Sequence, residues 1–143
     1  MNWKEEALEK LQRYPMMTLA LRTIPLELER LTREARELQS VGQGIGSRNR
    51  ENRAQENRMM NNLVRRQELE LQLEQARLWV SVTEEGLSHL TEEERSLLEK
   101  LYIQQIQATD LCQELGVERS SLYRYRDAAL KKLTLGLYGG LES

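Results

Sequence analysis

The stretch from Gln113 to Leu133, QELGVERSSLYRYRDAALKKL, gathers basic and hydroxyl side chains in a chain that is net acidic. The whole 143-residue protein has a formal charge of −2, whereas Arg119 to Lys132 holds five basic residues against one acidic residue. Arginine can donate two hydrogen bonds to a guanine edge, and lysine, serine and tyrosine can contact phosphate or base groups. The pattern therefore indicates a nucleic-acid interface on one segment.

Six side chains of this segment are candidate DNA contacts. We expect a helix to begin near Arg119 and to lie in the major groove as the second helix of a helix-turn-helix. Arg119 and Arg124 then suit guanine edges, where each bidentate pair discriminates by about 1–3 kcal/mol. The alternative is a basic face that is merely solvated. The six candidates are Arg119, Ser120, Ser121, Tyr123, Arg124 and Arg126.

The remaining polar side chains suit less specific contacts. Ser120 or Ser121 can bind bases or phosphates, and Tyr123 can pack on the sugar-phosphate backbone or on a thymine methyl group. The later basic residues suit phosphate, solvent or the negative end of the helix dipole; these are Arg126, Lys131 and Lys132.

Two helices and a tight turn must position these side chains. We expect a short helix from about Thr109 to Leu115 and a last helix from Arg119 to about Leu133, with Gly116 in the turn between them. Glycine accepts the positive φ angle that ends many helices. The alternative is a plain corner of a helical bundle. The expected inward positions are Leu111, Cys112, Leu115, Val117, Leu122 and Tyr125.

A capped helix precedes this pair. TEEE, at Thr91–Glu94, is a capping box in which Thr91 is the N-cap and Glu94 stands three residues later. An apolar stripe follows and fades around Gln104–Gln107, where we expect the helix to end. The stripe consists of Leu97, Leu98, Leu101 and Tyr102.

Two heptad seams fill most of the remaining chain. The first belongs to the N-terminal helices, residues 1–40, which we expect to be broken near Tyr14-Pro15 and again at Pro25, because an interior proline costs about 3 kcal/mol. The second belongs to a long amphipathic helix at residues 59–89. The first seam contains Met17, Leu21, Ile24, Leu28, Leu31, Ala35 and Leu38, and the second contains Leu69, Leu73, Ala76, Val80, Thr83, Leu87 and Leu90.

Residues 41–58, VGQGIGSRNRENRAQENR, are expected to form a flexible linker between the seams. The seams could then pair as an antiparallel hairpin within the chain or pair between chains, and the sequence leaves both open. Extra apolar residues beside the second seam favour more than one partner helix. We expect a homodimer that forms through the heptad helices. We also expect a helix-turn-helix domain at residues 90–135, followed by a C-terminal tail at residues 136–143.

Composition excludes several function classes. The chain has one histidine and one cysteine, so we expect no catalytic site, metal or cofactor. The glycines of GQGIG lack the lysine and strand of a phosphate-binding loop. No apolar run reaches the roughly 18 residues that span a bilayer. The expectation is an all-α cytoplasmic protein without a membrane segment or an evident small-molecule ligand.

A resemblance then becomes visible. Residues Leu90–Leu133, which begin LTEEERSLLEKLY and end ALKKL, resemble the C-terminal domain of sigma-70 type factors that reads the −35 promoter element. By position, the resemblance implies that Arg119, Ser120 and Arg124 contact bases and that Ser121 and Tyr123 contact the backbone. The domain that melts the −10 region has no counterpart here.

The layout and the segment LEKLQRYP resemble the ArpU/RinA group of phage and prophage late-gene regulators. That resemblance implies a transcription regulator that binds double-stranded DNA in a bacterial host, with host RNA polymerase as a candidate partner. Two alternatives stay open. One is a DNA-packaging protein similar to a phage small terminase subunit, and the other is a protein-interaction module that does not bind DNA directly.

Overall fold

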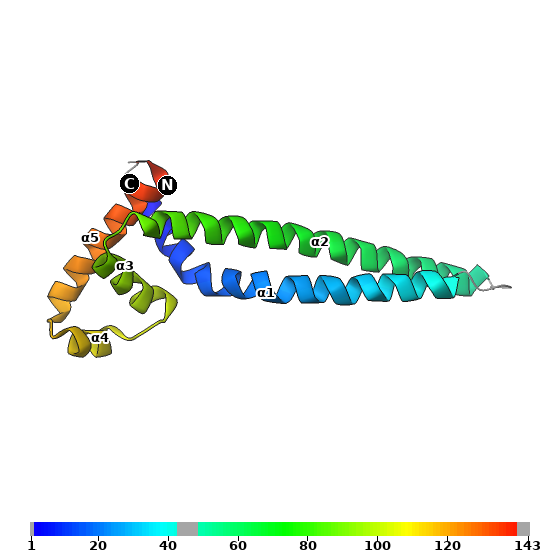
Figure 1. The fold of residues 1–143 in the computed structure, drawn as a ribbon, viewed down its shortest axis with the longest axis horizontal. Helices are drawn as coiled ribbons and strands as arrows, with labels where there is room; N and C mark the ends of the chain where they lie inside the picture. Colours follow the sequence, from blue (N-terminus) through cyan, green and yellow to red (C-terminus); the bar gives the residue numbers. More distant parts are fainter. Residues whose placement is uncertain (1, 43–48, 140–143) are drawn as a thin grey trace. The chain divides into compact units, whose positions relative to one another are not determined.

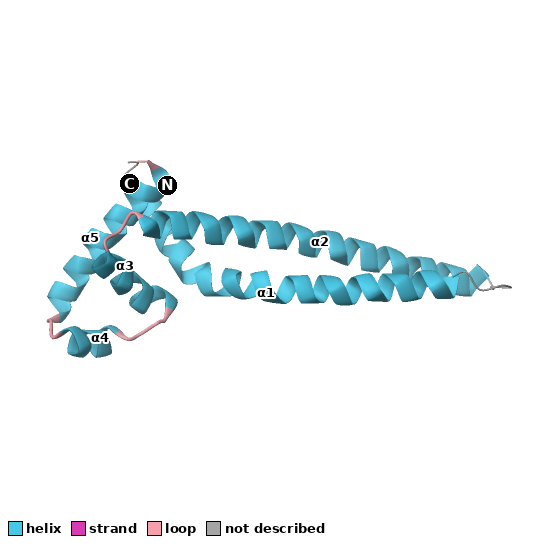
Figure 2. Cartoon of the chain, in the orientation of Figure 1, coloured by secondary structure: helices cyan, strands magenta, loops and turns pink. Residues whose placement is uncertain are grey.

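All regular structure in the computed structural model is helical over the residues that it describes, 2–42 and 49–139 (Figures 1 and 2). The prediction of an all-α fold is confirmed. The elements are α1 (Trp3–Gly42), α2 (Asn49–Ser88), α3 (Glu92–Leu98), the π-helical turn η1 (Glu99–Ile103), α4 (Ala108–Leu115) and α5 (Arg119–Tyr138).

Helix α1 continues through both of its prolines, so the predicted breaks near Tyr14-Pro15 and at Pro25 are wrong. Proline removes one backbone hydrogen bond from a helix interior. Pro25 is exposed on α1, so its ring does not disturb the packed side of the helix. Buried seam residues on both sides, Leu11 and Ile24 before it and Leu31 after it, hold the helix against its neighbours.

Helix α2 begins ten residues earlier than predicted, because residues 49–58 of the expected linker are helical. The sequence pattern misled because the seam continues there with polar residues. Gln55 is buried, and its side-chain amide donates a hydrogen bond to the carbonyl of Leu38. The rest of the predicted linker, at residues 43–48, lies outside the described residues.

One compact unit, Leu19–Arg77, is an antiparallel pair of helical segments from α1 and α2 (Figure 1). The two predicted seams meet here within the chain, at Ile24 and Leu31 on α1 and at Leu69 and Leu73 on α2. The heptad surface is therefore covered within the chain, and the predicted homodimer would need another surface.

A buried asparagine specifies the register of this pair. Asn62 occupies a seam position of α2, and its Nδ2 donates to the carbonyl of Leu31 at 2.8 Å and to Oε1 of Glu34 at 3.2 Å. A polar residue in an apolar seam fixes helix alignment at some cost in stability. Sliding either helix by one turn would leave the buried amide without its partners.

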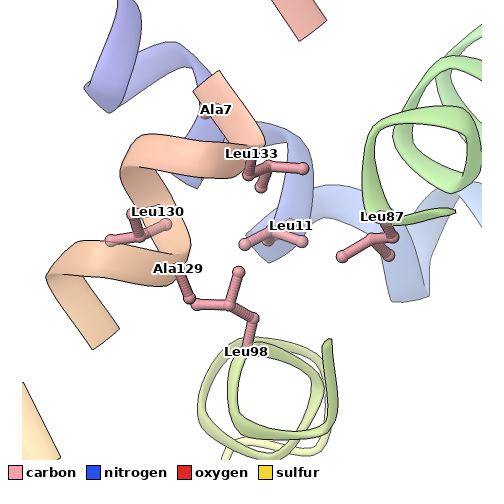
Figure 3. Packing of buried hydrophobic residues seen from close by; sticks show 7 residues of the cluster. All are labelled: Ala7, Leu11, Leu87, Leu98, Ala129, Leu130 and Leu133. Atoms are coloured by element: carbon pink, nitrogen blue, oxygen red, sulfur yellow. The ribbon is translucent and has the colours of Figure 1, made fainter. Parts of the chain in front are cut away.

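The second compact unit combines residues 2–18 with Leu78–Gly139 of the described chain. It is therefore larger than the predicted domain 90–135, because the first part of α1 and the last part of α2 contribute to its core. Figure 3 shows that core, where side chains from α1, α2, α3 and α5 converge. Its buried members are Ala7, Leu11, Leu87, Leu98, Ala129, Leu130 and Leu133.

Helix α5 ends at Tyr138, beyond the predicted end near Leu133, so residues 136–138 of the expected tail are helical. The ring of Tyr138 packs against Trp3, with centroids 4.9 Å apart. Leu137 approaches α2 so closely that a Cβ on Gly86 would lie 2.6 Å from its Cδ2 atom. These contacts with α1 and α2 extend the helix; residues 140–143 lie outside the described residues.

The predicted capping box is confirmed. The backbone N–H of Glu94 donates to Oγ1 of Thr91 at 3.2 Å, and the N–H of Thr91 donates to Oε1 of Glu94 at 3.0 Å. Lys132 of α5 lies 3.0 Å from the same carboxylate. The hydrogen bond from Thr91, reinforced by Lys132, lowers the pKa of Glu94 from its ordinary value of 4.5.

We expect Leu133→Ala to lower the free energy of unfolding by about 2–5 kcal/mol, because Leu133 is fully buried and its truncation leaves a cavity. Leu135→Ala is the matched control, since Leu135 lies on the same helix and is 38% exposed. Urea unfolding measures both. Equal losses would show that Leu133 is not part of a close-packed core.

The capping box should also give a defined pH dependence. A carboxyl whose pKa is lowered on folding stabilises the folded state above its unfolded pKa, and this contribution disappears as the pH falls through the folded pKa. Wild type should therefore exceed Glu94→Gln in stability by a constant amount at neutral pH, and the difference should shrink below about pH 4.5. Thermal melts across this range test it, and a difference that is independent of pH would contradict it.

Candidate nucleic-acid interface

The turn between α4 and α5 has the geometry that the sequence predicts. Gly116 has φ 68° and ψ 35°, in the left-handed region, and ends α4. The N–H of Val117 donates to the carbonyl of Cys112 at 3.1 Å. The chain then enters α5 at Arg119, so only Gly116–Glu118 separate the two helices.

A small core holds the two helices together. Leu111 of α4 and Leu122 of α5 are fully buried, and Leu97 of α3 packs against them. The predicted inward positions Cys112 and Val117 are partly buried in the same cluster. This core fixes the direction in which the N-terminal half of α5 presents its outer face.

Two of the predicted inward positions are wrong. Leu115 is 47% exposed and Tyr125 is 52% exposed. Leu115 is the last residue of α4, where the helix is about to turn. The buried side of α5 follows Leu122, Ala129 and Leu133, and Tyr125 falls at the edge of that side.

Four of the six candidate contacts are exposed on the N-terminal half of α5: Arg119, Ser120, Tyr123 and Arg124. Their spacing of one, three and one residues brings them to one face of a helix with 3.6 residues per turn. Ser121 is partly buried beside this face and accepts a hydrogen bond from Nη2 of Arg124 at 3.3 Å. The structure therefore brings five of the six candidates together.

Sequence reasoning missed Thr109, in the first turn of α4. Its Oγ1 accepts a hydrogen bond from Nη2 of Arg119 at 2.8 Å, so the first residue of α5 reaches across to the start of α4. Neither Arg119 nor Arg124 forms an ion pair with any residue of the described ranges. Their charges are available to an anionic partner.

Arg126 is placed differently from the other candidates. It is partly buried, lies 3.0 Å from a carboxylate oxygen of Asp127 and covers the ring of Tyr123 at 4.7 Å. Burial opposes its charge, but Asp127 and the hydroxyl of Tyr102 outweigh that effect and raise the pKa of Arg126. Arg126 is engaged within the protein and supports Tyr123, which makes it a weaker phosphate contact than the sequence suggested.

The histidine, cysteine and carboxylate side chains of the described residues do not gather into a metal site. Within residues 2–42 and 49–139, no group of three or more His, Cys, Asp or Glu side chains could hold a metal ion. His89 is exposed beside Glu85 at 3.6 Å, and Cys112 is partly buried in the small core. No helix of the described chain is long and apolar enough to cross a membrane.

We expect Gly116→Ala to lower the free energy of unfolding by about 1–2 kcal/mol. The cause is conformational, because a Cβ at this position would meet no atom within 4 Å, whereas the left-handed backbone is unfavourable for L-residues. Gly116→Asn should lose less, since asparagine tolerates this conformation. Chemical unfolding of both variants checks the order, and an alanine variant as stable as wild type would contradict it.

A comparison with models of protein families gives a match. A protein-family model described as "Protein of unknown function (DUF1492)" matches residues 51–134, which is more than half of the chain. The matched range begins in α2, includes α3 and α4, and ends within α5 beyond its exposed basic face. Comparisons with the curated proteins and with the solved structures gave no match.

Proposed function

The chain belongs to the DUF1492 family, and we propose that it is a sequence-specific double-stranded DNA-binding regulator of transcription. The observation that carries this proposal is the exposed face of Arg119, Ser120, Tyr123 and Arg124 at the start of α5. In this proposal α4, the turn and α5 act as a helix-turn-helix, and α5 enters the major groove.

The local electrostatics support this assignment. Arg119 and Arg124 donate hydrogen bonds only to hydroxyl groups within the described chain, so DNA would replace bonds to uncharged acceptors and not ion pairs. The N-cap residue of α5, Glu118, makes no side-chain cap hydrogen bond. The first amides of α5 can therefore serve a phosphate, which helix N-termini bind well.

The positions of these side chains suggest which part of the DNA each one would contact. Arg124 and Ser120 read base edges, while Arg119, close to Thr109, reads a base or aligns the helix on a phosphate. Tyr123 packs on the sugar-phosphate backbone, and Arg126 keeps its ring in place from 4.7 Å. Each base contact by an arginine would contribute about 1–3 kcal/mol of discrimination.

The biological setting is part of the proposal. The resemblance to sigma-70 type −35 readers and to the ArpU/RinA group supports a late-gene activator of a phage or prophage, acting in the cytoplasm of a bacterial host. Host RNA polymerase is then a natural partner. Two copies would improve affinity and specificity, because a single helix of this charge makes few phosphate contacts.

The test is selection of a binding site from random and phage-genomic duplex DNA, followed by affinity measurements against salt concentration. Arg124→Ala should cost about 1–3 kcal/mol at particular base pairs and relax discrimination there. Arg119→Ala should lower the salt slope by about one if it contacts a phosphate.

Arg22→Ala is the matched control, since it removes one exposed arginine of α1 and the same net charge. It should bind the selected duplex as wild type does. If no motif is enriched and the two α5 variants bind like this control, α5 does not read DNA.

A further inference from the structure

An apolar groove crosses the outer surface formed by α3, α4 and α5. It consists of two adjoining hollows of about 380 and 330 Å³ that share Glu93, Leu97 and Leu115. Leu97 and the fully buried Leu111 form the floor of the larger hollow. Tyr125 and Ala128 of α5 line the smaller one.

Two large apolar side chains at the rim of this groove are exposed. Leu115 and Tyr125 occupy sequence positions that predict burial, yet 47% and 52% of their surfaces are accessible. Adjoining large apolar residues at the rim of a hollow commonly mark an interaction site. Burying them against a partner would remove from water the apolar area that the domain leaves uncovered.

The charges around the groove select the kind of partner. Three glutamates line it, Glu92, Glu93 and Glu94, against one lysine, Lys100. Lys100 lies 2.7 Å from Glu114, so its charge is already matched. Glu94 is matched in the same way by Lys132, at 3.0 Å. The unmatched charges of the rim are therefore Glu92 and Glu93, and its net charge is negative.

This charge argues against two occupants. DNA would place phosphates against carboxylates, and a second copy docked through the same groove would bring the two acidic rims together. Like charges across an interface cost several kcal/mol. A segment with basic residues beside an apolar ridge would satisfy both the hollow and the rim.

We propose that the groove lined by Leu97, Leu115 and Tyr125 is a docking site for a basic amphipathic helix of a partner protein. The apolar ridge of that helix fills the two hollows, and its lysine or arginine side chains meet Glu92 and Glu93. Helix-in-groove recognition of this kind uses apolar anchors one turn apart. The regulator would then hold DNA with one side of α5 and a protein with another.

Three fluorescent peptides of equal length test the proposal on the full chain. The first has leucines one helical turn apart, flanked by arginine and lysine. The second has the same composition in an order that destroys the apolar ridge, and the third keeps the ridge with glutamate flanks. The first should bind about tenfold more tightly than either of the others.

Variants then locate the binding site. Leu115→Ala combined with Tyr125→Ala should weaken the first peptide about tenfold, whereas Leu135→Ala, an exposed leucine of α5 outside the groove, should not. Glu93→Gln should weaken binding less and reduce its dependence on salt. Circular dichroism melts establish that each variant is folded.

Equal binding of the three peptides would overturn the proposal, and so would a preference for the first peptide that survives the double substitution in a folded variant. The outcome is independent of the proposed DNA contacts, since none of these substitutions removes Arg119, Ser120 or Arg124. Loss of peptide binding with intact DNA binding would assign the two partners to different sides of α5.

Discussion

The structure depends on the burial of one side of α5 against three other helices. Ala129, Leu130 and Leu133 pack on Ala7 and Leu11 of α1, on Leu87 of α2 and on Leu98 of α3. Gly86 allows α2 to approach α5, because any side chain there would collide with Leu137. This packing fixes the C-terminal half of α5, and the smaller core of Leu97, Leu111 and Leu122 holds its N-terminal half, whose outer face presents polar side chains.

The surroundings of α5 therefore differ from one side of the helix to the next. One side is core, a second side has Arg119 and Arg124 without carboxylate partners, and a third side borders the groove at Tyr125. The carboxylates of α3 lie at the groove, and Lys132 is matched to Glu94 there. Within the described residues, Arg119 and Arg124 have no carboxylate partner and Glu92 and Glu93 have no cationic partner, which allows two partners of different chemistry.

The sequence was sufficient to predict those features in which one local requirement determines the residue type. The capping box at Thr91–Glu94 and the left-handed Gly116 were predictable because both depend on a few neighbouring atoms. The heptad seams were predictable because the apolar residues recur at a regular spacing along each helix. Of the candidate site, the exposed basic face of α5 follows from sequence spacing.

The features that sequence missed depend on tertiary packing. Pro25 is tolerated because buried residues on both sides of it hold α1 against its neighbours. Gln55 is buried because the carbonyl of Leu38, on the facing helix, accepts a hydrogen bond from its side-chain amide. Arg126 is partly buried and paired with Asp127, which a charge count cannot show. The exposure of Leu115 and Tyr125 depends on where α4 ends relative to α5, and that is a property of the assembled domain.

Whether α5 enters the major groove is tested most directly by methylating the selected duplex with dimethyl sulfate in the presence of saturating protein. The reagent modifies guanine N7 in the major groove and adenine N3 in the minor groove. Insertion of α5 into the major groove predicts protection at guanine N7 within the selected motif and its loss with Arg124→Ala. Protection confined to adenine N3, or no protection at saturation, would contradict the account.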